Sequence, residues 1–153
     1  MSRKRCHRRH WVPMPPRALL PKLTRDQVQD LCIAHMTNLD LVANGKADEA
    51  LLWDMVGAVL LWSKVAEQLQ AGVDEMLEQL NLATAVVQRY GRTGRVGFSG
   101  AEYQLAKRGV EVMDQLAEMV DKPTAVAAAE WGNLRVQAMA HEVAAQRRLQ
   151  QAA

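Results

Sequence analysis

The chain has 153 residues and a formal net charge of +2, and hydrophobic residues make up 49% of it, which excludes a disordered polypeptide for most of its length. Aromatic residues are sparse at 5%, while Ala, Leu, Val, Met and Gln are frequent. This mixture favours helices, because unbranched side chains lose little rotamer freedom there. The two cysteines provide no disulfide framework and suit a reducing cytosol.

Charge is divided unevenly along the chain. Residues 1–25 contain eight Lys/Arg and no acid, which gives +8. The rest of the chain contains eleven Lys/Arg and seventeen Asp/Glu, which gives −6. This asymmetry indicates a basic arm joined to a mildly acidic folded body, and it points to a polyanionic partner.

Residues 1–23 are predicted to form a flexible, irregular arm. Pro13, Pro15 and Pro16 lack amide donors and bias the residues before them away from helix. They also stand where a secretory signal would need an apolar segment. The longest apolar stretch, Leu51–Trp62, is shorter than the ~20 residues that cross a bilayer. We therefore expect a cytoplasmic protein with no membrane association.

Helical spacing of apolar residues begins after the arm. The segment Thr24–Gln27 matches a capping box, so a first helix is predicted over residues 24–43. Asp48 is the predicted cap of a second helix over residues 48–70, whose wide apolar stripe predicts a central position. A third helix is predicted over residues 73–89.

The second half of the body begins with a glycine-rich segment. Gly91–Gly100 contains four glycines and is predicted to be a loop. A second capping box, Ser99–Glu102, can start a fourth helix. Pro123 either ends that helix or lies in the first turn of a fifth one, which Asp121 would cap and which would run over residues 124–150.

These patterns predict an all-α fold: residues 24–153 form a bundle of four to five helices, antiparallel where the loops are short, behind the arm of residues 1–23. The alanine-rich segment 125–145, which contains Trp131, is a candidate face for a homo-oligomer. Packing of that segment within the chain is the more common alternative.

The leading candidate site is the arm segment RKRCHRRHW, which holds five Lys/Arg within seven residues. Cations near phosphates release condensed counterions, and Arg also pairs bidentately with phosphate. A Trp can stack on a base or enter a protein groove. A solvated tail that aids solubility is the alternative. The residues predicted to bind nucleic acid are Arg3, Lys4, Arg5, Arg8, Arg9 and Trp11, with Arg92 and Arg95 as additional contacts.

Arg89, Arg92 and Arg95 flank the glycines that precede the fourth helix. Backbone amides exposed at such a loop could bind an anion together with these guanidinium groups. A positively charged hinge between two helices is the alternative.

Metal binding and catalysis have little support in the sequence. Cys6, His7 and His10 are candidate ligands, and Cys6 and His10 would share one helix face. A closed zinc site needs four ligands, and no CxxC or HxxxH motif supplies the others. The remaining candidates are Cys32, His35 and His141. Since no nucleophile elbow or repeated Glu-x-x-His pair occurs either, we expect a non-enzymatic protein without metal or cofactor.

The stretches Arg3–Trp11 (RKRCHRRHW) and Arg89–Gly100 (RYGRTGRVGFSG) resemble the signatures of a family of small helical proteins. These uncharacterised proteins are encoded by temperate phages and prophages of proteobacteria. The second stretch has their form R-Y-x-x-T-G-x-x-G-x-x-G, and the order and approximate spacing match along most of the chain. The resemblance implies a phage accessory protein that acts in the cytoplasm of the bacterial host, and it brings no activity with it.

The sequence therefore favours binding to DNA or RNA through the arm. The alternative is a protein-protein interaction module, such as an inhibitor of a host or defence factor. In that case the arm would dock on an acidic protein surface, and the helices would form the interface.

Overall fold

The computed structural model describes residues 20–152, which form five helices. They are α1 (Arg25–Ala43), α2 (Glu49–Leu69), α3 (Val73–Thr93), α4 (Gly100–Met119) and α5 (Lys122–Gln151). The only β-type pairing within this range is an isolated bridge between Lys22 and Asp121. The prediction of an all-α bundle is confirmed. The predicted arm falls almost entirely outside the described residues.

Both predicted capping boxes are present. At the start of α1, the Thr24 hydroxyl accepts from the Gln27 amide at 3.2 Å, and the Gln27 side chain accepts from the Thr24 amide at 3.0 Å. Ser99 and Glu102 form the same pair of bonds before α4. These side chains satisfy amide groups that have no partner within the first turn of a helix.

The two remaining predicted caps are also present. Asp48 accepts from the Leu51 amide at 2.9 Å and starts α2. Asp121 accepts from the Thr124 amide at 2.9 Å, so Pro123 lies in the first turn of α5. Of the two placements that the sequence left open for this proline, the first turn of α5 is the one observed. Proline is accepted there because its missing N–H would have no helical partner.

The end of α3 differs from the prediction. The helix continues to Thr93, so the loop covers only residues 94–99 and Gly100 already belongs to α4. Gly91 is buried in α3, where a Cβ would lie 3.8 Å from Val143 of α5. Packing against α5 thus outweighs the low helix propensity of glycine. Gly94 ends the helix at φ +68°, a left-handed conformation that glycine adopts readily.

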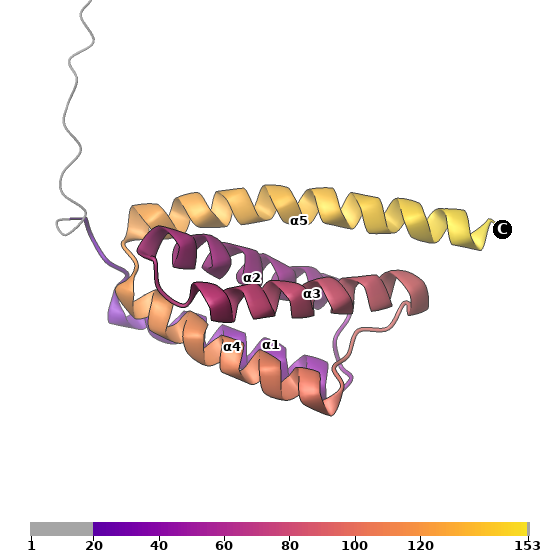
Figure 1. The fold of residues 1–153 in the computed structure, drawn as a ribbon, viewed down its shortest axis with the longest axis horizontal. Coiled ribbons are helices and arrows are strands. Elements are labelled where there is room, and N and C mark those ends of the chain that lie inside the picture. Colours follow the sequence, from indigo (N-terminus) through magenta and orange to yellow (C-terminus); the bar gives the residue numbers. More distant parts are fainter. Residues whose placement is uncertain (1–19, 153) are drawn as a thin grey trace, which may run out of the picture.

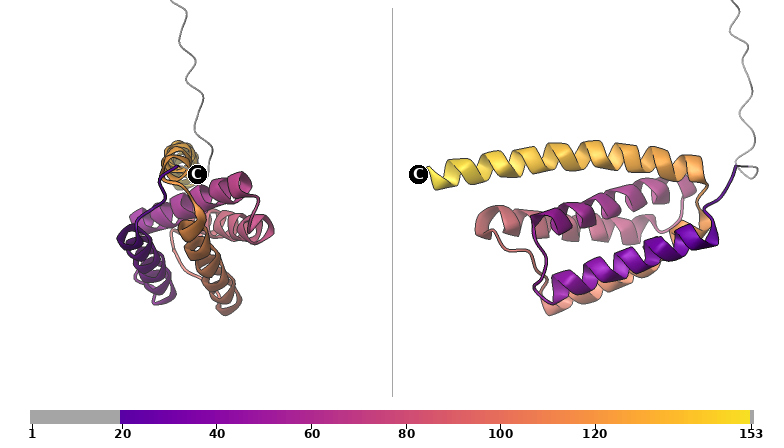
Figure 2. Two further views of the ribbon diagram at one scale, coloured as in Figure 1. Left: turned by 90° about the vertical axis from the view of Figure 1, so that its left-hand side faces the viewer. Right: turned by 180° about the vertical axis from the view of Figure 1, so that it is seen from behind.

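Consecutive helices run antiparallel and are arranged in three layers (Figures 1 and 2). α1 and α4 lie side by side on one surface, α2 and α3 form the middle layer, and α5 crosses the opposite surface. α2 contacts each of the other four helices, which confirms its predicted central position. Its Trp62 is 1% exposed and is the largest fully buried side chain.

Small residues bring α5 close to α2. A Cβ on Gly132 would lie 3.5 Å from the carbonyl oxygen of Gly57, and Ala128, one turn earlier in α5, is 3% exposed. This part of the alanine-rich segment therefore packs within the chain, which is the alternative to the homo-oligomer face considered from the sequence. None of the helices within residues 20–152 carries an apolar stretch of the length that a bilayer crossing requires.

Candidate functional site

The six arm residues predicted to bind nucleic acid, and the candidate ligands Cys6, His7 and His10, lie outside the described residues. The chain enters the described body beside the junction of α4 and α5 (Figure 1). There the Pro21 carbonyl accepts from the Lys122 amide at 2.7 Å, and Lys22 bridges to Asp121. The position where the arm joins the body is thereby fixed.

Arg92 and Arg95 lie at the other end of the bundle, in the last turn of α3 and in the loop after it (Figure 1). Both residues are exposed. Within residues 20–152, no side chain forms an ion pair with either guanidinium. The structure therefore leaves both charges available to solvent, and it separates them from the point where the arm begins.

Arg89 has a different environment from the other two arginines of this segment. Its Nη1 donates to the Gly97 carbonyl at 2.8 Å, and its Nη2 forms an ion pair with Glu102. The hydrogen bond from Arg89, reinforced by the Ser99 amide, lowers the pKa of the Glu102 carboxyl. Arg89 thus fastens the loop to α4, and its charge is balanced by Glu102.

A polar cluster beside the C-terminal turn of α3 was not anticipated from the sequence. Arg147 of α5 donates to the Tyr90 hydroxyl at 2.6 Å, and its guanidinium lies 4.8 Å from the centre of that ring. The Trp53 indole donates to Glu49 at 3.3 Å. Hydrogen bonds from Tyr90 and Trp53 lower the pKa of the Glu49 carboxyl, while burial and Glu49 raise the pKa of Tyr90.

His35, which the sequence offered as a distant metal ligand, is 7% exposed between α1, α2 and α4. Its Nε2 lies 3.0 Å from the donating Trp62 indole nitrogen, and its Nδ1 lies 3.2 Å from an Asp114 oxygen. An imidazole that accepts at Nε2 carries its proton at Nδ1, so this geometry corresponds to the neutral ring. Both nitrogens are therefore engaged, which leaves neither for a substrate or a metal.

Cys32, the second distant candidate, lies one turn before His35 and is partly buried. Burial, together with the neighbouring Asp114 carboxylate, raises the pKa of the thiol to about 11. The protonated thiol is a poor metal ligand and a poor nucleophile. In the part of the chain that the structure describes, no group of three or more His, Cys, Asp or Glu residues is arranged to hold a metal ion.

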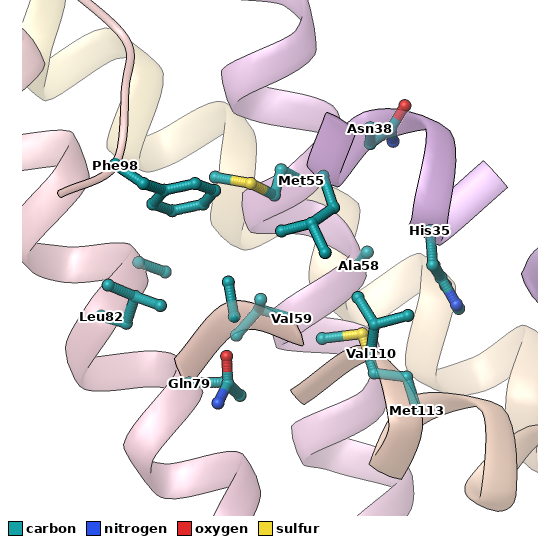
Figure 3. Close-up of a pocket in the computed structure, with 13 residues that line it drawn as sticks. His35, Asn38, Met55, Ala58, Val59, Gln79, Leu82, Phe98, Val110 and Met113 are labelled. Carbon is teal, nitrogen blue, oxygen red and sulfur yellow. The ribbon is translucent and has the colours of Figure 1, made fainter. Parts of the chain in front are cut away.

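An apolar cavity lies between α1, α2, α3 and α4, with Phe98 of the loop next to Met55 at one end (Figure 3). His35 and Asn38 lie on the far side of it (Figure 3). The free volume is about 40 Å³, much less than the 300–1,000 Å³ of typical small-molecule sites. With Phe98 in this position the cavity is packing space rather than a substrate cleft.

Comparison of the chain with protein-family models, with curated proteins and with solved structures gave no match. The phage context therefore stays a prediction from the two sequence signatures.

Proposed function

We propose that this chain is a non-enzymatic phage accessory protein that binds the phosphate backbone of DNA or RNA through its basic arm. Trp11 would stack on an exposed base, and Arg92 and Arg95 would contact phosphates from the body. The arm supplies the remaining contacts through Arg3, Lys4, Arg5, Arg8 and Arg9. The observation that carries the proposal is the charge division, with eight cations and no acid in residues 1–25.

The acidic character of the rest of the chain supports the same proposal. With a net charge of −6, the remainder would be repelled by a polyanion, so attraction has to come from local groups of cations. Arg92 and Arg95 form one such group that no described carboxylate neutralises.

The distance between these arginines and the point where the described chain begins, at Pro21 and Lys22, also fits an extended ligand. They are separated along the bundle by the length of α3, whose 21 residues span about 30 Å at the usual helical rise. This length is close to the ~34 Å of one turn of B-form DNA. A single duplex lying along the bundle could therefore reach from Arg92 and Arg95 to the point where the arm joins the body.

The first prediction concerns the charge of the arm in the full chain. Replacing its five cations (R3S, K4S, R5S, R8S and R9S together) is expected to weaken binding to a duplex of about 30 base pairs by more than about tenfold at low salt, because the released counterions drive the association. Fluorescence anisotropy of the labelled duplex measures this loss.

A matched control separates charge from side-chain identity at the same positions. The variant R3K, R5K, R8K and R9K keeps every positive charge and is expected to retain most of the affinity. Wild-type affinity in the serine variant would remove the arm from the binding site.

The second candidate function is binding to a protein. It is favoured by the exposed apolar side chains of α5, where Leu134 and Leu149 are 68% and 74% exposed. Large apolar side chains in solvent are common at protein interfaces. Under this alternative the wild-type chain would show no affinity for the duplex, and the five serine substitutions would change nothing in that titration.

A further inference from the structure

A third arginine lies against the backbone of Gly94, the residue midway between Arg92 and Arg95, although it is more than fifty residues away in sequence. Gly94 stands between the other two, and a Cβ placed on it would lie 3.0 Å from the Nη2 atom of Arg147. The end of α5 thus brings a guanidinium against the C-terminal turn of α3. We call Arg92, Arg95 and Arg147 the arginine corner.

Arg147 is held in a defined position. Its Nη1 donates to the hydroxyl of Tyr90, a side chain that is 4% exposed, and its guanidinium lies over the ring of that residue. Among residues 20–152, this hydroxyl is the single acceptor that the Arg147 side chain engages. The other N–H groups stay available, and a preorganised guanidinium loses little conformational entropy when it binds a ligand.

The charges near the corner leave it positive. The positive charge of Arg147 helps to lower the pKa of the Glu49 carboxyl, which accepts hydrogen bonds from Tyr90 and Trp53. Arg89 and Glu102 balance each other. Within residues 20–152, none of the three corner arginines forms an ion pair with a carboxylate.

We propose that the arginine corner binds backbone phosphates of DNA or RNA as a second site, separate from the arm. Guanidinium groups pair bidentately with phosphate oxygens, and Tyr90 acts as a positioning residue for Arg147. This inference rests on the proposed function, since the ligand is the same polyanion, but it assigns a role to Arg147 that neither the arm nor the loop requires.

The test uses full-length variants and the salt dependence of duplex binding. Each neutralised phosphate contributes about 0.9 to the slope of log affinity against log salt. The double variant R92S and R95S is expected to lower this slope by about 2, and R147Q by about 1. The control K107S and R108S removes two exposed cations of α4, and its slope should match that of wild type.

Tyr90→Phe separates positioning from charge, and it also covers the case that R147Q fails to fold. It keeps all three guanidinium groups and removes the hydroxyl that holds one of them. We expect the salt slope to stay unchanged and the affinity for the duplex to fall by about threefold. This loss corresponds to less free energy than one charged hydrogen bond contributes. A Y90F affinity equal to that of wild type would remove Tyr90 from the proposal.

The outcomes distinguish this inference from the proposed function. If the R92S and R95S variant behaves like the α4 control while the arm variant loses binding, phosphate binding by the arginine corner is refuted and binding by the arm is supported. If the R92S and R95S variant loses binding while the arm variant does not, binding by the corner is supported and binding by the arm is refuted. If no variant differs from wild type, both proposals fail.

Inorganic tripolyphosphate gives an independent readout, because it should raise the melting temperature of wild type but not that of R92S and R95S.

Discussion

His35 illustrates how single residues restrict the chemistry of this protein. With Trp62 donating to one ring nitrogen and Asp114 facing the other, the imidazole is a structural link between α1, α2 and α4. A general base needs a free nitrogen within reach of its substrate. The most buried titratable histidine of the described chain is thus committed to packing, and the candidate site consists of arginines at the surface.

The ion pair between Glu102 and Arg89 predicts how the stability of the protein depends on pH. The hydrogen bond from Arg89 lowers the pKa of Glu102 in the folded protein below the ordinary 4.5. The contribution of ionised Glu102 to stability is therefore present above pH 4.5 and is lost as the pH falls through the lowered pKa. Both side chains are partly exposed, so E102Q should cost about 1 kcal/mol at neutral pH. Urea denaturation at pH 7 and near pH 3 should show that this difference shrinks in acid.

Glu111→Gln supplies the control for that comparison. Glu111 is exposed on the same helix, so its replacement should change the free energy of unfolding little at either pH. An E102Q penalty that is as large near pH 3 as at pH 7 would contradict the role given to the ionised carboxylate.

At the scale of helices, α3 and α4 cross where Gly109 meets Gln79. The Gln79 side chain is 4% exposed and donates to the Leu105 carbonyl at 3.0 Å. A Cβ on Gly109 would overlap the Gln79 amide. Glycine normally weakens the interior of a helix by about 1 kcal/mol relative to alanine, so its presence here is explained by the close approach of Gln79.

Gly109→Ala should therefore destabilise the protein by about 1–3 kcal/mol in spite of its better helix propensity. Adding Gln79→Ala should remove most of this extra cost, which makes the two changes non-additive. Thermal and urea denaturation of the two single variants and the double variant measure the coupling. Gly100→Ala, at a position with open space, is the control, and strictly additive effects would contradict the proposed overlap.

The local signals in the sequence were sufficient for helix starts and insufficient for one helix end. Capping boxes and Asp caps depend on residues three apart, so all four predicted starts that they mark were found. The end of α3 depends on Gly91 packing against α5, a contact between residues about fifty positions apart. Such contacts are decided by distant segments that local patterns do not include.

At the scale of the whole molecule, α2 and α3 separate α5 from the layer of α1 and α4, and the extra length of α5 brings Arg147 to the end of α3 (Figure 2). Arg92 and Arg95 were predicted as candidate contacts from the sequence, and the structure finds both exposed, while the arm stays a prediction. Arg147 could not be predicted, because its place beside Gly94 follows from helix lengths and crossing positions. The arginine corner thus combines Arg92 and Arg95, which the sequence points to, with Arg147, which only the fold brings to them.

The measurement that tests the central claim most directly is the affinity of the full chain for a duplex of about 30 base pairs, followed between about 50 and 200 mM salt. If the five arm cations each neutralise a phosphate, the slope of log affinity against log salt should be about −4 or steeper, a loss of a few hundredfold over this range. A slope near zero, or no binding at the lowest salt, would contradict the account.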